Sequence, residues 1–362
     1  MTAQGLRLVG TGPAARSTWE VVLATNPTVP AFQTPAWLDA ICEATSYADA
    51  TRAYRTKDGR SMVLPMAGRA LHGPLSFEGS LPVGWGACGL VASDGAVSAE
   101  DVAEVVADIR RRVGLRTTIR PGPAGHEAWE SAVPAHVVRT RHMVQTVDLA
   151  GGFDAVWRER FSSAVRRACA KAERSNLRVE AVEGPRLIPV FDALYRRSVA
   201  RWARQQGRSV RVAQLDASYR EPRRKFEAVA DRLGPRCRVW VAWRDGRPAA
   251  GIMVVSNGDH ASYWRGAMDP DVEAGTRANQ LLHRLAIEHA CSLGQRFYHM
   301  GESSPDSSLA RFKRGFGTQD FHYTGYRFER LPVTSATDLL RRELGRFRAL
   351  AGRRRRTHAP AP

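Results

Sequence analysis

The chain has 362 residues, enough for two domains, and its 43% apolar and 8% aromatic content excludes a wholly disordered protein. Five cysteines lie far apart with no C-x-x-C pair, and the ten histidines form no H-x-x-x-H or H-E-x-x-H pattern, so neither a disulfide framework nor a metal site is expected. The net charge of +18 attracts phosphate-bearing partners over long distances, although arginines spread over solvated faces would give the same number.

The sequence contains no run of eighteen apolar residues, and its first twelve residues lack the apolar segment of a signal peptide. We therefore expect a cytoplasmic protein with reduced, mostly buried cysteines. The basic C-terminal segment is also compatible with a peripheral location at the inner face of the membrane.

The first half, residues 1–145, is predicted to form a domain of strands and helices. Asp58-Gly59 is a turn signal between two short strands, and Ser98 can cap a helix whose valines recur at helical spacing. The expected elements are strands at 53–56 and 61–66, a helix at 98–113, and strands at 115–119 and 144–149.

The second half, residues 146–330, is predicted to hold an antiparallel meander with turns at Asp245-Gly246 and Asn257-Gly258. The triplet Asp58-Gly59-Arg60 recurs as Asp245-Gly246-Arg247, which favours two related halves. The expected order is a helix at 153–176 with a basic outer face, a helix at 189–204, an Arg-rich connection, strands at 237–243, 248–255 and 260–266, a helix at 276–293, a strand at 297–300, a short helix and a strand at 321–328.

The stretch from Gly301 to Gly317, GESSPDSSLARFKRGFG, stands out near the end of this half. A polar loop follows a strand, and the next helix alternates basic with aromatic residues, which suits chemistry on an anionic ligand. An ordinary surface loop before a short helix has the same pattern, so both interpretations remain open.

The last segment, residues 331–362, is predicted to form a basic amphipathic helix that ends in Arg353 to Arg356. Such a segment can lie on an anionic membrane, bind nucleic acid or act as a solubilising end.

The order meander, helix, strand, helix, strand resembles the core of the GNAT acyltransferases. That resemblance implies a turn of the form R/Q-x-x-G-x-G/A that holds the pyrophosphate of coenzyme A at the start of the helix after the meander. Aligning Leu281-Leu282 with the leucines that often follow this turn puts Thr276 and Ala278 at its two glycine positions. Because a threonine there would crowd the pyrophosphate, we expect a degraded coenzyme A site.

The chain resembles most specifically the Fem-type branch of this superfamily, which includes peptidoglycan peptidyltransferases and their bacterial relatives. The resemblance lies in FSSAVRRACAKAERSNLRVE, in SYWRGAMDPD followed by ANQLLHRLAIEHACSLG, and in GESSPDSSLARFKRGFG. The resemblance covers residues 153–328. The first half matches the family only by its position in the chain, without a shared motif. The resemblance implies an α/β protein of two GNAT-like domains, each a mixed, largely antiparallel sheet flanked by helices, with the basic C-terminal helix added.

The Fem-type resemblance further implies aminoacyl-tRNA as the donor, an acceptor site between the two domains, no covalent enzyme intermediate and no cofactor. Lys313 matches the lysine of the family's F-K motif, and we expect it to stabilise the developing oxyanion or the terminal phosphate of the tRNA. Glu302 and Asp306 are the carboxylates that could take the proton of the attacking amine or orient it. They suit turn and cap roles around Pro305 equally well.

A set of basic, aromatic and polar residues is predicted to bind the substrate and tRNA. Six basic residues would contact phosphates, and Tyr263 and Trp264 would stack on a base or sugar. The full set is Arg166, Arg167, Lys171, Tyr263, Trp264, Arg265, Asn279, Ser303, Arg311, Phe312 and Arg314.

Three functions are compatible with these features. The first is amide formation from aminoacyl-tRNA and an amine of a peptidyl, cell-envelope or natural-product precursor. The second is an N-acyltransferase that uses acyl-coenzyme A on an amino sugar or envelope precursor. The third is a catalytically silent module that binds a membrane or nucleic acid through the basic tail. The degraded coenzyme A turn and the charge surplus favour the first.

Overall fold

The computed structural model describes residues 5–70, 76–112 and 114–330, so the predicted helix at 331–362 lies outside the described residues. No helix in those ranges is long and apolar enough to cross a membrane. All five cysteines are free thiols, and Cys88, Cys169 and Cys237 are buried, as expected.

The first half contains the predicted hairpin and the predicted capped helix. The Ser98 hydroxyl accepts a hydrogen bond from the Asp101 amide at 3.1 Å, and the Asp101 carboxylate accepts one from the Ser98 amide at 3.0 Å. The elements are β1 (Arg7–Thr11), α1 (Arg16–Thr25), α2 (Pro35–Ala44), β2 (Ala48–Asp49), β3 (Arg52–Arg55), β4 (Ser61–Leu64), β5 (Ala67–Ala70), β6 (Ser76–Gly79), β7 (Val91–Ala92), α3 (Ala99–Arg112), β8 (Arg116–Ile119) and α4 (His126–Ala132).

The second half contains the predicted meander, with turns at the two predicted positions. Its elements are β9 (Val138–Asp148), α5 (Gly152–Ala155), a π-helical turn (Val156–Arg160), α6 (Ser163–Glu173), β10 (Arg178–Glu183), α7 (Ile188–Gln205), α8 (Val210–Arg220), α9 (Arg223–Leu233), β11 (Cys237–Arg244), β12 (Arg247–Asn257), β13 (His260–Met268), α10 (Pro270–Thr276), α11 (Ala278–Ser292), β14 (Phe297–Glu302), α12 (Ser308–Arg314) and β15 (Gln319–Glu329).

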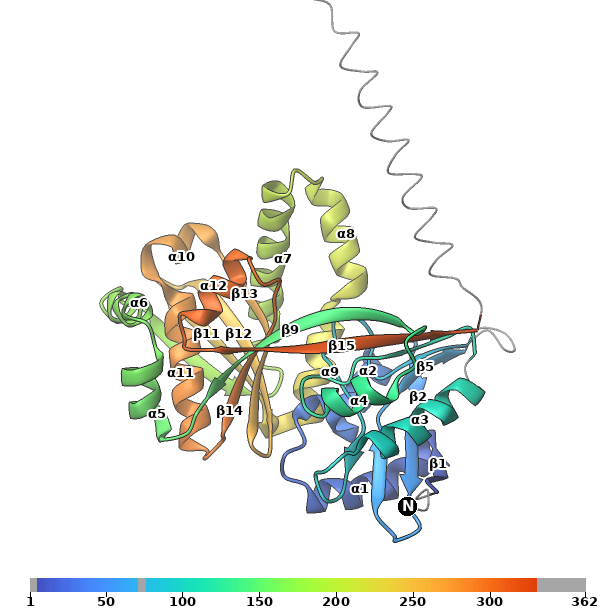
Figure 1. The fold of residues 1–362 in the computed structure, drawn as a ribbon. Helices are drawn as coiled ribbons and strands as arrows, with labels where there is room; N and C mark the ends of the chain where they lie inside the picture. Colours follow the sequence, from blue (N-terminus) through green and yellow to red (C-terminus); the bar gives the residue numbers. More distant parts are fainter. Residues whose placement is uncertain (1–4, 71–75, 113, 331–362) are drawn as a thin grey trace, which may run out of the picture.

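Two long strands connect the halves. The described strands form a 4-stranded sheet in the order β1-β3-β4-β7 and an 11-stranded sheet in the order β10-β11-β12-β13-β14-β9-β15-β8-β6-β5-β2. The strands β9 and β15 pair antiparallel along most of their length and cross from one half to the other (Figure 1). The chain thus has two α/β halves, as predicted, and the predicted boundary at residue 145 falls inside β9.

The halves also share a hydrophobic core, which includes Trp264. The pairing of β12 with β13 shifts register between Met253 and Val254, so Trp264 is an extra residue in a β-bulge. Its ring centroid lies 5.2 Å from that of Trp37 in α2 and 5.9 Å from that of Trp85. A bulge in the second half therefore packs directly against the first.

Two predicted elements differ from the structure. The helix expected at 153–176 is broken at Phe161 and Ser162, because the Ser162 hydroxyl caps a new helix by accepting from the Val165 amide at 3.2 Å. The Arg-rich connection expected after the helix at 189–204 forms α8 and α9, whose buried faces carry small or apolar side chains and, in α9, also Lys225.

Candidate active site

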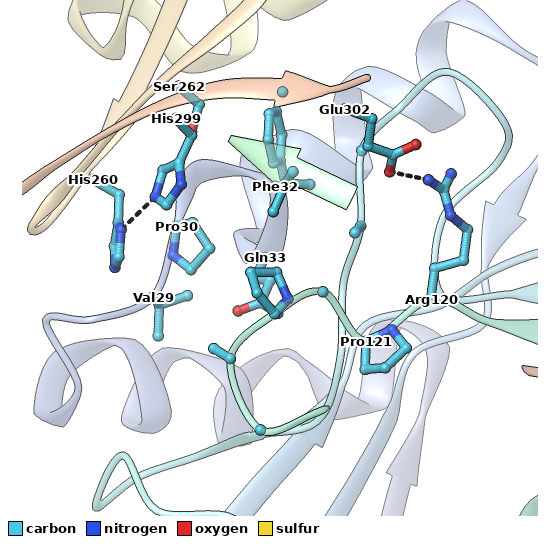
Figure 2. A pocket seen from close by; sticks show the side chains of 18 of the residues that line it. Val29, Pro30, Phe32, Gln33, Arg120, Pro121, His260, Ser262, His299 and Glu302 are labelled. Carbon is cyan, nitrogen blue, oxygen red and sulfur yellow. Dashed lines mark hydrogen bonds and ion pairs between the residues drawn. The ribbon is translucent and has the colours of Figure 1, made fainter. Parts of the chain in front are cut away.

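A cavity of about 510 Å³ lies between the two halves (Figure 2). Its first-half walls come from loops at 26–33, 83–97 and 120–125. Its second-half walls come from β13, β14 and α12, at the point where the parallel strands β13 and β14 part after Ser262 and His299. Backbone N–H and C=O groups that would otherwise pair between the strands are available at such a gap.

The carboxylate of Glu302 lies on the wall of this cavity and is held by side chains from both halves. Arg120 donates a hydrogen bond to it, Tyr323 donates its hydroxyl at 2.5 Å, and His142 Nδ1 lies 3.6 Å away. Burial alone would raise its pKa, but the His142 hydrogen bond, the Arg120 charge and the Tyr323 hydrogen bond together lower the pKa of Glu302 to about 2. This carboxylate is therefore ionised and weakly basic at neutral pH.

Lys313 also borders the cavity and is only 2% exposed. Its ammonium group donates to the Gly301 carbonyl at 3.0 Å, to the Glu302 carbonyl at 2.8 Å and to the Ser303 hydroxyl at 2.8 Å. Burial lowers the pKa of Lys313 to about 8. All three hydrogens of the ammonium are thus used to hold the loop after β14 in place.

The network continues outward from Ser303. The Ser303 hydroxyl donates to Gln145 Oε1 at 2.9 Å, and the fully buried Gln145 donates to the Ala310 carbonyl at 3.2 Å and to Asp320 at 2.9 Å. Arg314 in turn donates to Asp320 at 2.7 Å. The predicted residues Ser303, Lys313 and Arg314 therefore belong to one polar network that joins β9, β14, α12 and β15.

A second polar chain lines the other side of the cavity. His260 Nε2 lies 3.0 Å from the Thr28 carbonyl, His260 Nδ1 lies 2.8 Å from His299 Nε2, and His299 Nδ1 lies 2.9 Å from the Thr146 hydroxyl (Figure 2). Because a carbonyl only accepts, His260 donates to it through Nε2, and neutral His299 donates in turn to His260 Nδ1. Burial lowers the pKa of both rings, that of His299 to about 3, so both are neutral at physiological pH.

The six basic residues predicted to bind phosphate do not converge. Only Arg265 lines the cavity, and it donates to Glu221 at 2.9 Å. Arg166 instead donates hydrogen bonds to carbonyl groups of the preceding helical turn, including those of Trp157 and Arg158 at 3.2 Å each, and so stabilises the end of that helix. The exposed members with no ion pair to a described residue are Arg167, Lys171 and Arg311.

The remaining predicted residues have varied surroundings. Tyr263 and Trp264 both line the cavity, Tyr263 with its ring centroid 4.6 Å from His283. Trp264 is 6% exposed and packs in the core against Trp37 and Trp85, so little of its ring is open for stacking. Phe312 packs 5.3 Å from Phe316 in the second-half core. Half-buried Asn279 in α11 and exposed Asp306 in the loop before α12 do not line the cavity.

The turn that would hold coenzyme A is filled by protein. Thr276 is fully buried, and its hydroxyl donates to the Glu273 carbonyl at 3.1 Å. Arg277, at φ 60°, links α10 directly to α11, so no open glycine turn precedes α11. No group of three or more His, Cys, Asp or Glu side chains in the described ranges could hold a metal ion.

The sequence interpretation missed the residues that surround Glu302 and the histidine chain. Arg120, His142 and Tyr323 come from three separate strands or strand ends, and no local spacing connects them. His260 and His299 lie on neighbouring parallel strands, so a correct pairing of β13 with β14 was the one signal that could have brought them together.

Comparisons with known proteins agree with this architecture. Residues 159–314 match the family described as the acetyltransferase (GNAT) domain. A search of curated protein sequences finds no significant match. The family match covers α6 to α12, the part of the chain that supplies β13, β14 and Lys313 to the cavity.

Several solved structures share the fold at low sequence identity. FemX is similar with a TM-score of 0.65 at 12% identity, over 90% of this chain and 97% of that one. L-PGS from Bacillus licheniformis is similar with a TM-score of 0.54 at 10% identity, over 94% and 99% of the two chains. The C-terminal domain of a putative lysylphosphatidylglycerol synthetase from Agrobacterium fabrum gives 0.52 at 14% identity, over 86% and 92%.

Proposed function

We propose that this chain, whose residues 159–314 match the acetyltransferase (GNAT) domain and whose fold is similar to that of FemX, transfers an aminoacyl group from aminoacyl-tRNA to an amine. The acceptor amine belongs to a peptidyl, cell-envelope or natural-product precursor and binds in the cavity between the two halves. The reaction forms an amide bond as the ester bond to the tRNA breaks. The attacking amine loses one proton, and the ribose oxygen of the tRNA takes one up and leaves as a hydroxyl group.

The observation that carries the choice of donor is the filled turn before α11. Thr276 occupies the position where the GNAT resemblance places a glycine, and its side chain is packed rather than open to a pyrophosphate. A donor whose phosphates bind elsewhere fits this geometry better. The net charge of +18 supports a polyanionic carrier.

In this proposal Lys313 acts through its charge. Its three hydrogens hold Gly301, Glu302 and Ser303 in place, while its buried positive charge on the cavity wall stabilises the oxyanion that develops during attack. Glu302 orients the acceptor ammonium and is too weakly basic to be the principal proton acceptor. An α-amine, with a pKa of about 7.7 to 8.0, supplies enough neutral nucleophile near neutral pH without a strong base.

An acyl-coenzyme A donor is the second candidate, because the family match is to acetyltransferase domains. In that case the acyl carrier would bind without the usual glycine turn.

The test is to incubate the protein with a labelled amino acid, total tRNA and synthetases, with and without ribonuclease, beside a panel of acyl-coenzyme A compounds. We expect transfer that ribonuclease abolishes. Transfer that persists after ribonuclease treatment, or that occurs only with an acyl-coenzyme A, would replace the proposed donor.

A further inference from the structure

The helix α8 carries an apolar face with no partner among the described residues. Its exposed side chains include Val212 at 58%, Leu215 at 72% and Tyr219 at 81% of their full accessibility. At about 100° per residue these three lie within an arc of roughly 60° on the helix. The opposite face, with Ala213 and Ala217, is buried. The exposed apolar stripe is thus a separate surface and not a part of the core.

Arginines surround this stripe. Arg211 and Arg220 flank it on the two sides of α8, and Arg208 lies in the loop just before the helix. Arg220 forms an ion pair with Asp216 at 2.8 Å, whereas Arg208 and Arg211 form none with any residue that the structure describes. The surface is therefore both apolar and positively charged.

The hairpin of α7 and α8 projects from the sheet (Figure 1), and the exposure of Val212, Leu215 and Tyr219 places their surface on the outside of the molecule. It is connected to the cavity through Glu221, the residue after α8, which accepts a hydrogen bond from the cavity residue Arg265 at 2.9 Å. A partner bound here would sit on the half that supplies Lys313.

We propose that the exposed face of α8 docks on an anionic lipid bilayer. Valine and leucine side chains gain free energy when they enter the boundary between headgroups and acyl chains, and tyrosine is favoured at that depth. Arginines beside the stripe can keep their guanidinium groups among anionic headgroups while their stems lie along the apolar layer. A nucleic acid would bind the arginines, but Val212 and Leu215 would gain no free energy from burial against it. A lipid bilayer is therefore the better match.

The test compares the partition of full-length variants onto vesicles. The variant V212S/L215S/Y219S removes the stripe, and Leu293→Ser removes a similarly exposed apolar side chain, 58% accessible, at the end of α11. Vesicles of phosphatidylcholine alone are compared with vesicles that also contain phosphatidylglycerol. Because all changed side chains are exposed, circular dichroism and thermal unfolding are expected to match the parent protein.

We expect the parent to sediment with the anionic vesicles, and the triple variant to lose at least about tenfold in partition coefficient. The Leu293→Ser control is expected to bind like the parent, and the double variant R208Q/R211Q is expected to weaken binding to anionic vesicles. Equal partition of parent and triple variant would overturn the proposal. So would loss of tRNA binding in the triple variant with vesicle binding unchanged, since that result would assign the surface to RNA.

Discussion

Lys313 is the residue on which the proposed chemistry depends most. Lys313→Met keeps the length of the side chain but removes the charge and the hydrogen bonds to the Gly301 carbonyl, the Glu302 carbonyl and the Ser303 hydroxyl. We expect turnover at saturating donor and acceptor to fall by more than about tenfold, with the fold retained.

Lys313→Arg is the matched control, because it keeps the charge while it changes the hydrogen-bond geometry. If the charge matters, the arginine variant should recover part of the turnover lost in the methionine variant, although both variants lose some thermal stability. A methionine variant with unimpaired turnover would remove Lys313 from the mechanism.

Glu302 is expected to act without changing its protonation state. Because the pKa of Glu302 is about 2, the carboxylate stays ionised throughout the neutral and alkaline range. Glu302→Gln should therefore lower kcat/KM by about tenfold while the shape of the pH profile stays the same. Asp306→Asn is the control and should leave both unchanged, since Asp306 is exposed and does not line the cavity. Loss of the acidic limb in the Glu302 variant would show that the carboxylate is a titrating base.

The His260–His299 pair makes stability depend on pH. Burial lowers the pKa of His299 from 6.5 to about 3, so the unfolded chain takes up a proton near pH 6.5 while the folded ring stays neutral. Stability is thus fully present above pH 6.5 and falls as the pH drops toward 3. Buried His283 acts in the same direction, because burial also lowers its pKa to about 3.

We expect His299→Gln to reduce the drop in melting temperature between pH 6.5 and pH 4.5. This window lies above the ordinary pKa of a glutamate, 4.5, so protonation of Glu302 contributes little to the drop. Exposed His322→Gln is the control and should leave the slope as in the parent. An unchanged slope in the His299 variant would show that this ring does not stay neutral in the folded state.

At the scale of elements, the bulge in β13 helps to pack the two halves together, beside the long strands β9 and β15 that connect them. It turns Trp264 toward Trp37 and Trp85, where its side chain is 6% exposed. Trp264→Ala should cost about 3 to 5 kcal/mol of unfolding free energy, because it leaves a large cavity in the shared core. Trp202→Ala, at a tryptophan that is 36% exposed, should cost clearly less in the same denaturant titration. Similar costs would mean that the core collapses around the missing ring.

Elements with a complete local signal could be predicted from the sequence, and those that depend on tertiary contacts could not. The turns at Asp245-Gly246 and Asn257-Gly258 and the cap at Ser98 each need only neighbouring residues, and all are present. The break at Phe161 and Ser162 has a local cap but also depends on a distant segment, because the Ser162 amide donates to the Gly315 carbonyl at 2.8 Å and the Phe161 ring centroid lies 5.2 Å from that of Phe316. The helix α8 buries only small side chains, so its pattern lacks the apolar periodicity that predicts a helix.

At the scale of the whole molecule, the cavity joins residues that lie far apart in sequence. Arg120 and Glu302 are 182 positions apart and His260 and Thr28 are 232 positions apart, yet each pair forms a hydrogen bond. The Fem-type resemblance could locate Lys313 and Glu302 because they lie within one quoted motif. It could not locate Arg120 or the histidine chain, because their positions follow from the β13-β14-β9-β15-β8 order of the sheet.

The charge surplus leads to the prediction that belongs to the whole molecule. If the proposed donor binds the basic surface, tRNA affinity should fall steeply with salt, with a slope of about −0.7 to −0.9 per phosphate contact in a plot of log K against log salt. Of the six basic residues predicted to bind phosphate, the three that are exposed and form no ion pair with a described residue are those expected to make such contacts. They are Arg167, Lys171 and Arg311.

Changing these three residues to Gln should reduce the magnitude of the slope by about two. The matched control changes three exposed arginines that are paired with Glu180, Glu227 and Glu43, namely Arg178, Arg223 and Arg232, and so removes the same net charge. Each of these guanidinium groups already has a carboxylate partner, so it should neutralise few tRNA phosphates and contribute little to counterion release. The slope of this control variant should therefore stay near that of the parent. Equal reductions in the two triple variants would mean that tRNA responds to net charge alone, and a flat salt response in the parent would separate the positive charge from the donor altogether.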